Sequence, residues 1–154
     1  MKNAWFSLYL LVLALWVGGI AVFTFIVTPV IFKSYARDMA GDIVGKLFPG
    51  YFAYLLVLSA LALLVLLAGN RSLLAWRVSF FLVAAALFVN VFMMFKLHPA
   101  IVKVKQEIVS LDRDAPASIT RDSFRKLHAA SAALNLFLFV DGVGLLVSSS
   151  LLKR

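Results

Sequence analysis

Four stretches of the chain are almost continuously apolar, and each is long enough to cross a bilayer as a helix. A helix needs about 20 residues for this, because each residue adds ~1.5 Å and the hydrocarbon layer is ~30 Å thick. The stretches run approximately from Trp5 to Phe32, Phe48 to Ala68, Leu73 to Leu97 and Ala129 to Leu152. Charged residues lie at or near the ends of these stretches, apart from Arg77 and Asp141. The pattern predicts an all-α, integral membrane four-helix bundle.

Two further segments have the periodicity of amphipathic helices. Their apolar stripes are Tyr35, Met39, Ile43 and Leu47 before the second span, and Ile101, Val104, Ile108 and Leu111 after the third. Charged residues fall between these positions, as in helices that lie on a membrane surface. We therefore predict two amphipathic connecting helices. The first should end before a helix that restarts at Phe48-Pro49, and the second should begin where the third span stops, at His98-Pro99.

The turn residues Gly69-Asn70-Arg71-Ser72 make the second and third spans antiparallel neighbours. With four spans, both termini lie on one face of the membrane and both amphipathic connections lie on the other. No internal repeat or second domain is visible, so residues 1–154 form a single transmembrane domain. The distribution of Lys and Arg leaves the orientation open, since the connections hold more of them and the short terminal segments hold them more densely. In a bacterial cell we expect the cytoplasmic membrane.

Composition supports the membrane assignment and removes several kinds of chemistry. Hydrophobic residues make up 64% of the chain and charged residues 14%, and the mean hydropathy is +1.01, which is outside the range of soluble domains. Cysteine is absent, which excludes disulfides, thiol catalysis and Cys-ligated metal centres. The net charge of +8 sits on residues that flank the spans, so these meet anionic headgroups and argue for a lipid bilayer, not nucleic acid, as partner. A homo-oligomer is compatible with the composition.

Asp141 is the acidic residue deepest in an apolar stretch, near the middle of the fourth span. A charged side chain there costs ~2.5–3.5 kcal/mol on insertion scales, so it needs a reason. Gly142 and Gly144 would allow another helix to come close. Asp141 is either a proton or cation site that faces the bundle interior, or a carboxyl that fixes helix packing. Arg77, a turn into the third span from the same face, is either its partner or a side chain that extends to the headgroups.

Two asparagines and two histidines are the other polar candidates. Asn90 and Asn135 should lie at similar depth on adjacent spans, where an interhelical amide hydrogen bond is the simpler explanation and an ion pathway the other. His98 and His128 are the only histidines and lie at the same membrane face, so they could converge as ligands of haem iron or a divalent metal. Interfacial histidines also hydrogen-bond simply to headgroups or carbonyls.

The order of several short motifs resembles a known family. The motifs are Trp16-Val17-Gly18-Gly19, Thr28-Pro29-Val30-Ile31-Phe32, Ala40-Gly41, Leu47-Phe48-Pro49-Gly50-Tyr51, Phe124-Arg125-Lys126-Leu127-His128 and Leu134-Asn135-Leu136. Together they resemble the transmembrane-protein-205-like family, known as domain of unknown function 4149, over most of the chain. Eukaryotic relatives are associated with resistance to platinum drugs, so the resemblance implies metal handling or export without a mechanism. In physical terms, Gly18 and Gly19 permit close helix contact, Pro29 bends the first span, and Tyr51 is an interfacial anchor.

Three functions are consistent with these residues. The leading hypothesis is a small membrane protein that binds or transports a metal ion or small cationic solute around Asp141, Asn90, Asn135 and the histidines. The second is a haem-binding redox protein with His98 and His128 as axial ligands. The third is a structural or accessory membrane subunit. Hydrolase motifs, phosphate loops and dinucleotide fingerprints are absent from the sequence, which argues against an enzyme.

Overall fold

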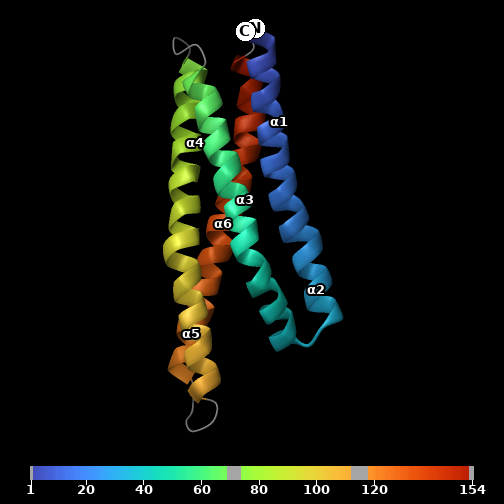
Figure 1. Cartoon of the computed structure of the whole chain (residues 1–154), viewed down its shortest axis with the longest axis vertical. Helices are drawn as coiled ribbons and strands as arrows, with labels where there is room; N and C mark the ends of the chain where they lie inside the picture. Colours follow the sequence, from blue (N-terminus) through green and yellow to red (C-terminus); the bar gives the residue numbers. More distant parts are fainter. Residues whose placement is uncertain (1, 69–73, 112–117, 153–154) are drawn as a thin grey trace.

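The computed structural model describes residues 2–68, 74–111 and 118–152, and every described residue except Tyr35, Ala36 and Ala68 is helical. The elements are α1 (Lys2–Ala21), the π-helical segment η1 (Val22–Val27), α2 (Thr28–Ser34), α3 (Arg37–Leu67), α4 (Leu74–Phe92), the π-helical segment η2 (Met93–Leu97), α5 (His98–Leu111) and α6 (Ser118–Leu152). The segments α1, η1 and α2 follow one another directly, as do α4, η2 and α5 (Figure 1). The described chain therefore folds into long helical rods, and the predicted all-α architecture is confirmed.

The helices of the described chain that could cross a membrane number four: Ala4–Ser34, Met39–Leu67, Trp76–Ile108 and Asp122–Ser149. Within the bundle α1 packs on α3 and α6, and α4 packs on the same two helices. α1 begins and α6 ends at one end of the molecule, whereas α2 and α5 end, and α3 and α6 begin, at the other (Figure 1). We call these the terminal end and the connection end. The predicted turn at residues 69–72 lies outside the described residues.

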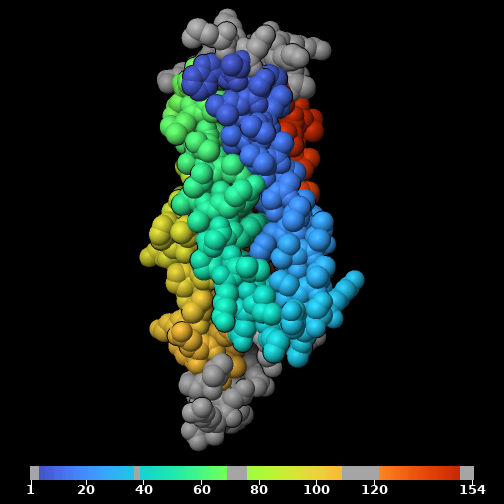
Figure 2. All heavy atoms as spheres, turned by 45° about the vertical axis from the view of Figure 1, so that its right-hand side comes forward, coloured from blue at the N-terminus to red at the C-terminus, as the bar shows by residue number. Residues whose placement is uncertain are grey.

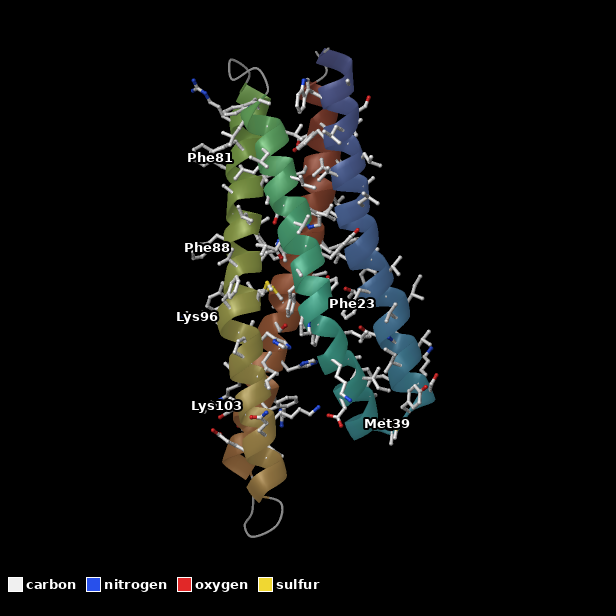
Figure 3. All side chains as sticks on the ribbon, viewed as in Figure 1. Phe23, Met39, Phe81, Phe88, Lys96 and Lys103 are labelled. Atoms are coloured by element: carbon white, nitrogen blue, oxygen red, sulfur yellow. The ribbon has the colours of Figure 1, made fainter. Side chains whose placement is uncertain are left out.

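The outer surface of the bundle is apolar, as expected for a protein solvated by lipid. Phe81 and Phe88 on α4 are 71% and 72% exposed and project away from the other helices (Figure 3). Exposed aliphatic and aromatic side chains occur on every rod. A soluble protein rarely exposes apolar surface on this scale. The chain is thus an integral membrane protein, and its outer side chains contact the acyl chains of the bilayer.

The first amphipathic segment was predicted to be a separate surface helix, but it forms the beginning of α3. The helix runs from Arg37 through Pro49 to Leu67 without a break. Proline removes one backbone hydrogen bond from a helix interior, yet it does not have to end the helix. Ala40, Val44 and Leu55 are buried at helical spacing on both sides of Pro49. One continuous buried stripe therefore favours one continuous helix.

The third span likewise continues through Pro99, although it was predicted to stop there. The His98 N–H bonds to the Met93 carbonyl five residues back, and the Thr28 N–H bonds to the Phe23 carbonyl in the same way. Each wide π turn therefore stands directly before a proline, Pro99 or Pro29. A proline ring in an α-helix clashes with the carbonyl four residues earlier, and a π turn changes that geometry. α5 itself has the predicted amphipathic pattern, because Ile101 and Ile108 are half-buried and Lys103 is exposed.

Candidate functional site

Asp141 on α6 is buried inside the bundle with only 7% of its surface exposed. Both carboxylate oxygens are buried, and neither has a hydrogen-bond partner among the described residues. Desolvating an ionised carboxylate without a partner costs several kcal/mol, even after the protein relaxes. An ionised carboxylate is therefore costly at this position.

Three other unpartnered polar groups lie in the terminal half of the bundle with Asp141. They are the Tyr9 hydroxyl and the Trp16 indole N–H on α1, and the Ser79 hydroxyl on α4, all buried and without a hydrogen bond by normal geometry. The Ser79 hydroxyl lies close enough to the Tyr9 hydroxyl for a weak hydrogen bond between them, and Asp141 lies within electrostatic reach of Tyr9. We call Tyr9, Trp16, Ser79 and Asp141 the carboxyl cluster. Native proteins leave few buried polar groups unpaired, so four in one region need an explanation.

Gly142 brings α1 close to α6 next to this carboxyl. A Cβ on Gly142 would lie 2.8 Å from Val17 Cγ2 and 3.9 Å from Trp16 Nε1. The predicted close approach at Gly142 is thus confirmed, and it places the Trp16 indole N–H beside α6. At Gly144 a Cβ would meet nothing within 4 Å, so the prediction of a close approach there is wrong.

Arg77 does not pair with Asp141. Its side chain is exposed, and the ion pairs found among the described residues join Lys105 to Asp42 and Arg125 to Asp122. The long side chain of arginine can reach the headgroup region from one turn inside a span, as in the alternative considered from the sequence. The carboxyl cluster consequently contains no basic side chain among the described residues.

Asn135 joins three helical rods nearer the connection end. The Tyr51 hydroxyl on α3 donates to Asn135 Oδ1 at 2.5 Å, and Asn135 Nδ2 donates to Thr24 Oγ1 in η1 at 2.8 Å. Tyr51 also stacks on Phe23 with ring centroids 4.1 Å apart. Asn135 therefore fixes the π segment against α3 and α6, which is a packing role.

Asn90 has a different partner, so the two asparagines do not form an amide pair. Asn90 Nδ2 on α4 donates to Ser59 Oγ on α3 at 3.3 Å, while Asn90 Oδ1 is buried without a partner. The two amides are turned toward different neighbours, because α4 and α6 each also pack on other helices. Their partners Ser59 and Tyr51 stand eight residues, or about 12 Å, apart along α3, so the prediction that the two asparagines lie at similar depth is wrong.

The two histidines have unlike surroundings. The His98 ring lies edge-on to Phe48 and Phe52 of α3, with its Nε2 buried and unpartnered. The His128 ring is exposed and stacks on Phe124 one turn earlier in α6. In the parts of the chain that the structure describes, no three His, Asp or Glu side chains gather as a metal site.

The residues of the family motifs lie mostly in packing contacts between helices or on the outer surface. Trp16 is fully buried, and a Cβ on Gly19 would collide with the ring of Tyr54, so Gly19 leaves room for that ring between α1 and α3. A Cβ on Gly18 would meet nothing within 4 Å, and one on Gly41 would approach only Lys105 Nζ, at 3.8 Å. Phe32 is exposed near the end of α2.

Sequence reasoning found Asp141 but not the rest of the carboxyl cluster. A carboxylate in an apolar stretch is conspicuous, whereas Tyr, Trp and Ser are common in membrane helices. Tyr9 and Trp16 are seven residues apart and thus share one face of α1, which was the available signal. Nothing in the sequence of α4 marks Ser79 as inward-facing.

Comparison with known proteins matches the chain to one family. The model of a domain of unknown function, DUF4149, matches residues 11–110, which run from the middle of α1 through α2, α3 and α4 to the last residue but one of α5. Comparisons with curated proteins and with solved structures gave no match. The matched region contains Trp16, Arg77, Asn90 and His98, while Asn135 and Asp141 lie beyond it on α6. The chain therefore belongs to the DUF4149 family.

Proposed function

We propose that this protein binds a small cation, in the simplest case a proton, at Asp141 inside the bundle and moves it across the membrane. The observation that carries the proposal is the carboxyl cluster, in which both Asp141 oxygens are buried and unpartnered. A carboxyl fixed there for packing alone would be expected to have a hydrogen-bond donor on another helix.

The neighbouring groups suit this role. The Tyr9 and Ser79 hydroxyl oxygens can accept a hydrogen bond from a protonated carboxyl or ligate a hard cation together with a carboxylate oxygen, and oxygen is the ligand that such cations prefer. The Trp16 N–H can donate a hydrogen bond to the carboxylate when the site is empty. The cluster would thus supply one arrangement when the cation is bound and another when it is not, and no basic residue in the described part of the chain competes for the carboxyl.

An intramembrane carboxyl is suited to reversible binding of a cation. The loaded, neutral site is tolerated by the apolar bundle, and the unloaded, charged site is costly, so uptake and release change the energy of the bundle by several kcal/mol. Proton relays of membrane transporters use intramembrane carboxyls in this way. In a bacterial cell the site would act across the cytoplasmic membrane. A divalent metal or small cationic solute is the alternative load at the same carboxyl.

Transport by reconstituted vesicles tests the proposal. Protein is placed in liposomes that contain a pH-sensitive dye or, in parallel samples, a dye selective for sodium, potassium or a divalent ion. A membrane potential is imposed, and the dye signal is followed while each ion is added in turn. We expect cation entry through the wild type and none through Asp141→Asn, which keeps the size of the side chain and removes its charge. Asp122→Asn is the matched control, because that carboxylate is exposed on the same helix and paired with Arg125. Equal cation transport by the wild type and by Asp141→Asn would contradict the proposal.

A further inference from the structure

A groove runs along the outside of the bundle between α3 and the continuous helix formed by α1, η1 and α2. It has a volume of about 440 Å³, and its walls include Gly19, Phe23 and Val27 on one side and Leu47, Gly50 and Tyr51 on the other. Figure 2 shows the hollow between these two segments, and Figure 3 shows Phe23 between their ribbons. The lining is almost entirely apolar. In a bilayer such a groove is filled by hydrocarbon.

Tyr54 and the glycines shape this groove. Tyr54 leans over Gly19 and donates its hydroxyl hydrogen to the Leu15 carbonyl at 2.6 Å, which closes the groove toward the terminal end. At Gly50 a Cβ would meet nothing within 4 Å, so the missing side chain leaves open space. The groove is therefore a preformed slot for something slender and apolar that enters from the connection end.

One lysine from each wall lies toward that open end. Lys46 directly precedes the groove residue Leu47 on α3, and Lys33 follows the groove residue Val27 by six residues, or about 9 Å along a helix. Both lysine side chains are exposed. The nearby Asp42 carboxylate is paired with Lys105, so its negative charge is already offset. An apolar slot with two cations beyond one end is complementary to an anionic lipid.

We propose that the groove holds one acyl chain of an anionic phospholipid, with the lipid phosphate between Lys33 and Lys46. Ammonium groups near an anionic membrane surface attract acidic lipid headgroups. A second copy of the chain fits less well, because a two-fold interface on this face would bring the same lysines toward each other. The proposal is independent of the cation site proposed at Asp141, which is buried inside the bundle and is not among the residues that line the groove.

Lipid retention in native mass spectrometry tests the proposal. Purified protein in detergent is equilibrated with phosphatidylglycerol or phosphatidylcholine of the same acyl chains, and the lipid-bound fraction is measured as the lipid concentration rises. Each lysine contributes about fivefold to affinity for an acidic lipid, so the wild type should retain one phosphatidylglycerol about 30-fold more tightly than one phosphatidylcholine.

Two pairs of variants locate the bound lipid. Gly50→Leu fills the groove and should lose binding of both lipids, whereas Gly45→Leu on the same helix, also with nothing within 4 Å of its Cβ and outside the groove, should retain it. Lys33→Gln with Lys46→Gln should reduce the preference for phosphatidylglycerol to about onefold. Lys96→Gln with Lys103→Gln, on the rod far from α2 in Figure 3, should leave it unchanged.

The lysine substitutions are at exposed positions and should not disturb folding. They therefore test the proposal even if Gly50→Leu fails to fold. Phosphatidylglycerol retained equally by the wild type and the Lys33 and Lys46 double variant would overturn the proposal. Equal retention of the two lipids by the wild type would overturn it as well, and so would undiminished binding by a folded Gly50→Leu protein.

Discussion

The contact at Gly142 allows the sharpest energetic prediction. In Gly142→Ala the new methyl group would lie 2.8 Å from Val17 Cγ2, whereas two carbon atoms in good contact are ~3.5–4.0 Å apart. Val17 is β-branched and has little rotameric freedom in a helix, so α1 has to move away by roughly 1 Å. Overpacking of this kind costs about 1–3 kcal/mol.

Gly144→Ala is the matched control for this change. It stands two residues further along the same helix, and its Cβ would meet nothing within 4 Å. Both substitutions raise helix propensity by the same amount, about 1 kcal/mol, so this contribution cancels when the two variants are compared. The difference between them is therefore the packing cost at Val17 alone.

Unfolding in mixed micelles measures this difference. The denaturing detergent fraction is raised, and the transition is followed by the fluorescence of the tryptophans and by circular dichroism. We expect Gly142→Ala to be less stable than Gly144→Ala by about 1–3 kcal/mol, a factor of roughly 5 to 150 in the folding equilibrium. Two variants that unfold within a few tenths of a kcal/mol of each other would refute the assignment of Gly142 as a tight contact between α1 and α6.

Two further substitutions separate functional from structural polar groups by the same unfolding measurement. Asp141→Val removes an unpartnered buried carboxyl and should leave the protein as stable as the wild type or more stable, whereas a carboxyl that pins the helices would give a clear loss. Tyr51→Phe keeps the ring stack on Phe23 and deletes the hydrogen bond to Asn135, so it should lose about 0.6 kcal/mol and no more than about 1.7 kcal/mol. No loss at Tyr51 would mean that this bond does not stabilise the bundle.

The number of spans was predictable from the sequence because hydrocarbon imposes a minimum length on every crossing helix. The helix ends were not, since the prediction treated Phe48-Pro49 and His98-Pro99 as boundaries. At Pro49 a buried stripe on both sides favours continuity, and at Pro99 a preceding π turn accommodates the ring. Proline marks a local change in the hydrogen bonds of a membrane helix more reliably than it marks the end of that helix.

A candidate site was predictable from the sequence only where placing a single side chain in hydrocarbon is energetically costly by itself. Asp141 met that criterion, because a carboxyl in hydrocarbon is expensive wherever it points. The pairings of Arg77, Asn90 and Asn135 depend on how each helix is rotated about its axis, which hydropathy does not encode when a span is apolar on all sides. Long side chains such as Arg77 add a further freedom, since they can leave the level of their own Cα.

The π segments also set the phase of the helices beyond them. A π turn contains one residue more than the α turn it replaces, and one residue is a rotation of about 100° about the axis. Without the extra residue in η2, each α5 residue would take the place of the residue before it, so the half-buried Ile108 would move to the exposed position of Glu107. A single-residue deletion between Met93 and Leu97 should therefore disturb the connection end of the bundle more than most substitutions there, although it removes no side chain that α5 uses.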